Sequence, residues 1–325
     1  AALAAVQAIA NGYQVALMAP TEILADQHRL NFENWMSPLD IHVALLTGNI
    51  KGKAREEVLK SIGNGGSQMV IGTHALFQEG VKFHKLGLTI VDEQHRFGVH
   101  QRLALREKGG ITNLSTDINA ILPHQLIMTA TPIPRTLAMT VYADLDCSTI
   151  DELPRGRKLV ATSVISNLRR NDVIQRVKKA CESGRQAYWV CTLIEESEMF
   201  EAEAAEVIAT ELKLILPKLS IGLIHGRLKP REKISIMEGF KSKKIDLLVA
   251  TTVIEVGVDV SNASLMIIEN AERLGLSQRH QLRGRIGRGS DQSHCVLLYN
   301  SNLSQNSKER LMIMRETSDG FKIAE

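Results

Sequence analysis

The sequence lacks the features that would place it in a membrane or a secretory pathway. It has no run of about 18 or more apolar residues, so no segment is predicted to span a bilayer. The opening stretch AALAAVQAIANGYQVALMAP has no basic region before its apolar part, unlike a signal peptide. We therefore expect no membrane contact and a cytoplasmic location.

Cysteines are few and scattered, and they include no CxxC pair. The four are Cys147, Cys181, Cys191 and Cys295. This pattern argues against a zinc site built on paired cysteines and against a disulfide framework, and it fits a reducing cytosol.

Aromatic residues and net charge are also low. Only 4% of residues are aromatic, so a base-stacking platform of the kind found in single-strand binders is not evident. The net charge of +3 is too small to establish nucleic-acid binding by itself. The ten histidines form no HExxH or similar ligand spacing, and apart from His95 we expect them at the surface or in helix caps.

Two series of short apolar runs, separated by helical stretches, are present instead. The first comprises VALMAP, HVALLTG, QMVIGTH, LTIVDE and HQLIMTATP; the second comprises AYWVCTLI, IGLIHG, DLLVATT, SLMIIEN and HCVLLY. Buried parallel strands have this pattern, and ligands bind at their carboxyl ends. The sequence therefore predicts an α/β fold of two domains, each a mainly parallel sheet flanked by helices. We place them at 1–150 and 159–300, with a polar linker at 151–158 and a further element starting at 301–325.

An Asp-Glu pair, Asp92 and Glu93, follows the apolar run LTIV and should project from the end of a strand. In ATP-driven motors an Asp at this place holds Mg²⁺ through water, and the next Glu polarises the attacking water. A bare Asp-Glu pair is also a common acidic turn. The longer text DEQHRFG is more specific, and it brings His95 in as a candidate for the nucleotide site.

The segment QLRGRIGRG places Gln281, Arg285 and Arg288 at spacings of four and three, which predicts one helical face. An arginine can reach γ-phosphate oxygens because its planar fork stays charged. The glycines disfavour a stable helix, so we expect them to serve a close approach to a phosphate or to a facing domain. A basic glycine-rich loop that binds any phosphate backbone is the alternative.

Other strand ends offer groups for coupling, for the nucleotide and for a nucleic-acid track. In TATPIPRT, the hydroxyls of Thr129 and Thr131 can bond a carboxylate or His95. In ATTVIEVGVDV, Gly257 and Asp259 can approach a nucleotide ribose. Hydroxyl, amide and basic groups grip a sugar-phosphate backbone without reading sequence. The track candidates are Thr21, Thr47, Gly48, Thr73, His74, His225, Gly226, Arg227, Thr251 and Thr252. Each of these positions, alone, is also compatible with an ordinary loop.

In order along the chain, these segments resemble the motifs of superfamily-two helicases. APTEILADQ resembles motif Ia, GTH motif Ib, DEQH motif II, TATP motif III, TTVIEVGVD motif V and QLRGRIGR motif VI, and IHG resembles the element after motif IV. IVDEQHRFGVHQR, TATPIPRTLAMT, YWVCTLIEESE, the long run from ATTVIEVGVD to LRGRIGRG and DGFKIAE closely resemble the RecG family of bacterial DNA helicases. The transcription-repair coupling factors share part of this text, but Gln94 and YWVCTLIEESE favour the RecG family.

The resemblance implies two tandem RecA-like domains that use ATP and Mg²⁺. It implies that Asp92 holds the metal through water, that Glu93 activates water, and that Gln281, Arg285 and Arg288 act at the γ-phosphate. It also implies a monomer that remodels stalled replication forks and Holliday junctions, with single-strand-binding protein as a further partner.

One departure from the family is large, because no GxGKT phosphate-binding loop is present. The only Gly-Lys pair, Gly52-Lys53, lacks the preceding glycine-rich turn and a following Ser or Thr. We expect the sequence to be a fragment, cut upstream of Ala1, without the family's wedge domain and with DGFKIAE beginning its translocation element. Such a fragment should bind ATP poorly. A transcription-coupled translocase and a non-catalytic nucleic-acid-binding module remain the alternatives.

Overall fold

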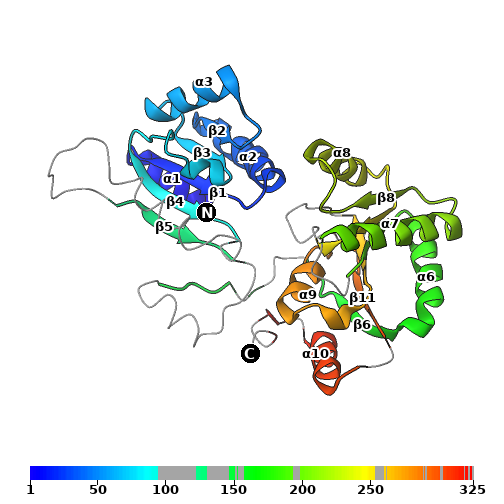
Figure 1. Ribbon diagram of the computed structural model, residues 1–325. Helices are drawn as coiled ribbons and strands as arrows, with labels where there is room; N and C mark the ends of the chain where they lie inside the picture. The colour runs from blue at the N-terminus through cyan, green and yellow to red at the C-terminus, as the bar shows by residue number, and fades with distance from the viewer. Residues whose placement is uncertain are drawn as a thin grey trace. The chain divides into compact units, whose positions relative to one another are not determined.

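The computed structural model describes residues 1–93, 122–129, 146–150, 152, 157–192, 198–252, 260, 262–287, 289, 291–300, 303–317, 319–320 and 323 (Figure 1). The chain divides into two compact units, Ala1–Ala130 and Thr131–Glu325. Each has its own hydrophobic core. The first unit ends before the boundary expected at 150, and the linker at 151–158 stays a prediction because five of its eight residues lie outside the described residues.

In the described residues of the first unit, five strands form a parallel sheet in the order β2-β3-β1-β4-β5. The strands are β1 (Gln14–Met18), β2 (Val43–Leu46), β3 (Met69–Gly72), β4 (Leu86–Val91) and β5 (His124–Ile127). The helices are α1 (Ala2–Ala10), α2 (Glu22–Met36) and α3 (Gly52–Gly63), with short 3₁₀ turns at Ser37–Leu39 and His74–Phe77. Thr21 is the N-cap of α2, as expected, since its Oγ1 accepts a bond from Leu24 N at 3.4 Å.

Helices cover both faces of this sheet, which is why β1 is buried along its whole length. Val15 and Leu17 pack on the side of α1 and α2, where Phe32 is also buried. Ala16 and Met18 face the other way, toward α3. Successive side chains point to opposite faces of a strand, so a strand with a core on each side must be apolar at every position.

Six strands of the second unit, among the residues that the structure describes, form a parallel sheet in the order β6-β11-β10-β7-β9-β8. The strands are β6 (Ala161–Ser166), β7 (Gln186–Val190), β8 (Ile221–Ile224), β9 (Leu247–Ala250), β10 (Ala263–Ile268) and β11 (His294–Tyr299). The helices are α6 (Arg170–Glu182), α7 (Glu198–Ile215), α8 (Pro230–Lys241), α9 (Leu276–Arg283) and α10 (Gln305–Glu316), with 3₁₀ turns at Asn167–Arg169 and Ala271–Arg273. Side chains of α6 and α7 lie in one core cluster, and those of α8, α9 and α10 lie in the other.

The two units share one strand order. Reading β7 to β11 in place of β1 to β5 turns β2-β3-β1-β4-β5 into β8-β9-β7-β10-β11, and β6 is an added edge strand. The match extends to the strand ends, because Asp92 N donates to Met18 O and Glu269 N donates to Val190 O, both at 2.9 Å. Position 92 of the first unit therefore corresponds to position 269 of the second.

The fold class predicted from the apolar runs is confirmed, and every predicted run contains a strand. The expected role of the segment 301–325 as the start of a further element stays a prediction. Its helix α10 buries Leu311 and Met314 in the core of the second unit, so this part of the segment belongs to that unit. Among the described helices, none has the length and apolar character needed to cross a bilayer.

Candidate functional site

Asp92 and Glu93 lie directly after β4, at the carboxyl edge of the first sheet. Asp92 Oδ1 accepts a hydrogen bond from Glu93 N at 3.0 Å, and the Asp92 backbone N–H is held by Met18 O. Glu93 has a φ of 51°, a left-handed conformation that is uncommon for a residue with a side chain. Such conformations persist where the surroundings enforce them, and they are concentrated at functional sites.

His28 of α2 is a partner of Asp92 that no sequence motif indicated. Its Nε2 lies 2.7 Å from Asp92 Oδ2, and the two side chains are 20% and 19% exposed. His28 lies 64 positions from Asp92 and in no catalytic-looking text. The expectation that histidines other than His95 lie at the surface or in caps is wrong for His28, and it is wrong for His225, which is 6% exposed.

The expectation that Gln281, Arg285 and Arg288 share a helical face is corrected in the second unit. Helix α9 ends at Arg283, with Gly284 as its C-cap, so Gln281 lies in the last turn and Arg285 lies beyond the helix. Gly287 has a φ of 79°, and a Cβ there would come within 2.9 Å of Val160 Cγ2. At Gly287, therefore, a left-handed turn and close packing require the glycine.

Two buried arginines of α9 hold this segment in place, and neither was predicted. Arg283 Nη1 donates to Met314 O at 3.0 Å and to Thr317 O at 2.9 Å, which ties α9 to the end of α10. Arg279 is fully buried and donates to Leu274 O through Nε and Nη2. Burial, followed by the charge of Arg310, lowers the pKa of Arg279 to about 10. These contacts fix the helix from which Arg285 follows.

His280 makes the second unit sensitive to acid. Burial, and next the charge of Arg283, lower the pKa of His280 to about 4, and its Nδ1 lies 3.0 Å from Arg283 Nη2. The unfolded chain binds a proton near pH 6.5, whereas the folded protein resists it down to about pH 4. The free energy of unfolding should therefore fall as pH drops from 6.5 toward 4, by up to about 1.4 kcal/mol per pH unit.

Denaturant unfolding followed by the fluorescence of Trp189, which is buried in the second unit, measures this slope. A Trp35→Phe background removes the signal of the first unit. We expect His280→Asn, which keeps an acceptor near the Nδ1 position but does not titrate, to flatten the slope. His42→Asn, at an exposed site in the first unit, is the control. An unchanged slope in His280→Asn would assign the acid sensitivity elsewhere.

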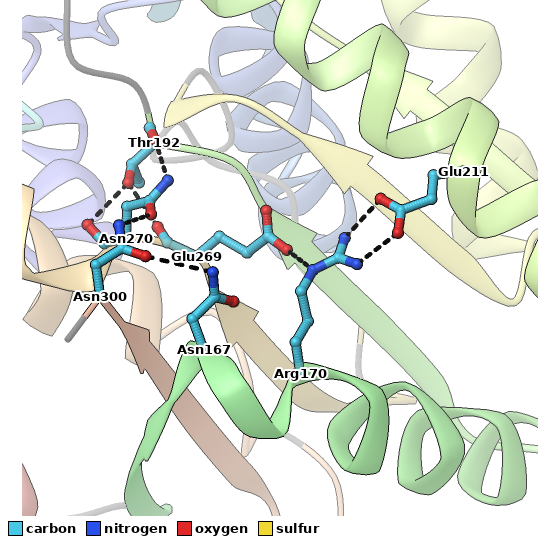
Figure 2. A network of polar contacts seen from close by, with 7 residues as sticks. All are labelled: Asn167, Arg170, Thr192, Glu211, Glu269, Asn270 and Asn300. Atoms are coloured by element: carbon cyan, nitrogen blue, oxygen red, sulfur yellow. Dashed lines mark hydrogen bonds and ion pairs between the residues drawn. The ribbon is translucent and has the colours of Figure 1, made fainter.

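In the second unit, a polar network occupies the position that corresponds to Asp92 (Figure 2). Arg170, at the start of α6, donates from Nε to Glu269 Oε1 at 2.5 Å and from Nη1 and Nη2 to Glu211 at 2.7 and 3.1 Å. Thr192 Oγ1 donates to Glu269 O, and Asn270 Nδ2 donates to Thr192 O. Asn270 has a φ of 48°, close to that of Glu93. The equivalent carboxylate is thus bound by a permanent cation.

The predicted track residues fall into two groups. Thr21, Gly48, His74, Gly226, Arg227 and Thr252 are exposed or half-buried. The side chains of Thr47, Thr73, His225 and Thr251 are buried. Among the described residues, Thr73 Oγ1, His225 Nδ1 and Thr251 Oγ1 have no hydrogen-bond partner. Thr73 and Thr251 follow β3 and β9, which are equivalent strands, so the same kind of buried hydroxyl recurs in both units.

Several predicted site residues lie outside the described residues. They are His95, Thr131, Gly257, Asp259 and Arg288. Thr129 is described and exposed, just beyond β5. Their roles stay predictions.

Comparisons with known proteins agree with this arrangement. The DEAD/DEAH box helicase family model matches residues 1–140, and the helicase conserved C-terminal domain matches residues 170–290. The chain is 63% identical to the ATP-dependent DNA helicase RecG of Escherichia coli strain K12 and 65% identical to that of Pasteurella multocida, over 100% of its own length. Over its whole length, the chain is therefore similar to RecG DNA helicases. It spans 46% of the length of each of these relatives.

Solved structures are also similar to this chain. A RecG bound to a three-way DNA junction matches with a TM-score of 0.76 and 41% identity, over 96% of this chain and 39% of that one. Yeast Dbp5 bound to RNA and ADP BeF3 matches with a TM-score of 0.67 over 94% of this chain and 75% of that one, at 14% identity. The second likeness shows the fold alone. The two units thus have the fold of tandem RecA-like helicase domains.

Proposed function

We propose that the protein is an ATP-dependent translocase of double-stranded DNA that remodels stalled replication forks and Holliday junctions. The observation that carries the proposal is the end-to-end match of the chain to RecG proteins, named ATP-dependent DNA helicases, with Asp92 and Glu93 placed at a strand's carboxyl end. The structure of a RecG on a three-way DNA junction supports branched DNA as the substrate. We infer action in the cytoplasm as a monomer, with single-strand-binding protein as a further partner.

The carboxylates suit Mg²⁺ held together with a nucleotide. Mg²⁺ prefers oxygen ligands and is usually bound by one or two carboxylates plus substrate phosphates. Within the part of the chain that the structure describes, no three His, Cys, Asp or Glu residues cluster as a complete metal cage. Asp92, with its half-buried carboxylate at the carboxyl edge of the sheet, fits a residue that holds such a metal through a bound water.

Bound Mg²⁺ would neutralise charge that develops on the phosphates. Asp92 would orient a water of the metal, and Glu93 would accept a proton from the attacking water. Arg285 and Arg288 would stabilise negative charge at the γ-phosphate, with Gln281 orienting groups beside them. Gly257, Asp259 and His95 would contact the nucleotide. Thr129 and Thr131 would couple nucleotide hydrolysis to the DNA contacts.

The track residues would hold DNA by its backbone. The exposed Arg227 and the half-buried Thr21 and Thr252 can supply charge and hydroxyl groups to phosphates. The buried hydroxyls of Thr73 and Thr251 lack partners among the described residues, and a buried hydroxyl without a partner is costly. In each unit, a backbone phosphate that reached this hydroxyl would give it a partner, which supports DNA contacts at these equivalent strand ends.

ATP hydrolysis by the full-length protein on different DNAs tests the proposal. We expect forked and four-way DNA to stimulate hydrolysis several-fold more than linear duplex of equal length and salt. Equal stimulation by linear duplex would contradict the branched substrate. Displacement of a stalled RNA polymerase without fork preference would favour a transcription-coupled translocase instead. DNA binding without any hydrolysis would favour a non-catalytic binding module.

A further inference from the structure

His28 connects the helix that begins at a predicted DNA contact to the carboxylate predicted to hold magnesium. Its Nε2 lies 2.7 Å from Asp92 Oδ2, while Asp92 Oδ1 is held by the backbone N–H of Glu93. Among the described residues, each carboxylate oxygen of Asp92 has one partner, and the bond from another element is the one to His28. A displacement of α2 would therefore change the hydrogen bond to Oδ2 and leave the bond to Oδ1 in place.

Helix α2 is suited to transmit such a shift. It begins after the half-buried cap Thr21, and His28 lies about 10 Å along its axis. Phe32 and Met36 are buried in the core, and the rings of His28 and Phe32 meet edge-on at 6.5 Å. Helix α2 is continuous from Glu22 to Met36. A displacement of its first turn, next to Thr21, would therefore also displace His28.

In the second unit, the carboxylate at the equivalent position is held by an ion pair. Glu269, equivalent to Asp92, is bound by Arg170, which also holds Glu211 (Figure 2). Arginine stays charged and donates from several nitrogens, so Glu269 is held by an ion pair that is costly to break when buried. Asp92 instead has one imidazole contact at a partly exposed position, which it can exchange for a metal-bound water.

We propose that His28 is a positioning residue that couples DNA contact at α2 to the orientation of Asp92 for Mg²⁺–nucleotide. The inference rests on the proposed function, and it gives His28 no contact with the metal or with DNA. When DNA engages the start of α2, His28 sets where Asp92 Oδ2 points. DNA and Mg²⁺–nucleotide then strengthen each other's binding, as coupled ligands must by thermodynamic reciprocity.

Binding of a fluorescent, non-hydrolysable ATP analogue with Mg²⁺ to the full-length protein measures this coupling. The quantity is the ratio of analogue affinities with and without forked DNA, which we expect to be on the order of five- to 100-fold for the unaltered protein. We expect the ratio to fall to within about twofold of one in His28→Ala. His28→Gln, which keeps an N–H donor on a similar reach, should restore part of it.

Two further variants separate coupling from stability. His42→Ala removes an exposed histidine just before β2, at the opposite edge of the sheet from Asp92, and should keep the full ratio. His28→Arg copies the Arg170 arrangement and should raise the Mg²⁺ concentration needed for half-maximal analogue binding. Thermal melting accompanies each variant. A His28→Ala protein that melts lower yet keeps the full ratio would reduce His28 to a structural residue and overturn the inference.

The outcomes also separate this inference from the proposed function. An unaltered protein that hydrolyses ATP on forks, but whose analogue affinity does not respond to DNA, would overturn the coupling and leave the translocase standing. An unaltered protein that neither binds Mg²⁺–nucleotide nor hydrolyses it would overturn both.

Discussion

Glu93→Gln is expected to lower DNA-stimulated ATP hydrolysis by the full-length protein about 100- to 10,000-fold, the usual contribution of a positioned general base. Glutamine keeps the length and shape of the side chain but cannot accept a proton from water. The left-handed backbone at position 93, with its φ of 51°, is enforced by surroundings that this change leaves intact. Nucleotide affinity should therefore stay within a few-fold of normal.

Steady-state phosphate release, with binding of a fluorescent ATP analogue measured in parallel, tests this expectation. Glu79→Gln changes an exposed carboxylate of the same unit and should leave hydrolysis unchanged. Near-normal turnover in Glu93→Gln would show that another group activates the water and would remove Glu93 from the catalytic set. An equal loss of nucleotide binding would instead give Glu93 a role in holding the metal.

Arg288→Ala is expected to lower hydrolysis about 1,000-fold or more while leaving DNA affinity unchanged, because an arginine finger contributes mainly to the transition state. Arg285→Ala should also reduce hydrolysis. Arg285 follows a helix that is held in place, because Arg279 and Arg283 of α9 donate to the backbone carbonyls of Leu274 and Met314. Arg288→Lys should recover little activity, since lysine lacks the planar fork.

DNA affinity, measured by fluorescence anisotropy at fixed salt, decides between the two readings of QLRGRIGRG. Arg176→Ala, at an exposed position on α6, removes one positive charge of the same unit and is the matched control. Weakened DNA binding with normal hydrolysis in Arg288→Ala would assign the arginine to the DNA track. That result would revive the alternative of a basic glycine-rich loop that binds any phosphate backbone.

The strands of both units could be predicted from the sequence because a strand covered on both faces must be apolar throughout. Gln14 and Gln186 show the limit of this signal. Each begins a central strand, is buried, and donates from Nε2 to two backbone carbonyls at the amino edge of its sheet. The apolar pattern does not predict these hydrogen bonds. The equivalence of the two units is likewise visible only in their shared strand order.

The helical spacing around Gln281 predicted too much helix. Spacings of four and three describe a face only while the helix continues, and α9 ends at Arg283. The glycines of this segment predicted the end of the helix correctly. Gly284 caps α9, and Gly287 adopts a left-handed φ of 79° against Val160.

The sequence by itself determined that Asp92 and Glu93 follow a buried strand and that two α/β units succeed each other, because both conclusions depend on local apolar patterns. Only the tertiary structure decided which groups touch them. His28 reaches Asp92 across 64 positions, Arg170 reaches Glu269 across 99, and Arg283 reaches the carbonyl of Met314 in α10. Such contacts depend on the order in which parallel strands and their helices assemble, and side-chain burial follows from that assembly. The same chain therefore carries one carboxylate with a single imidazole partner and an equivalent one bound by an arginine.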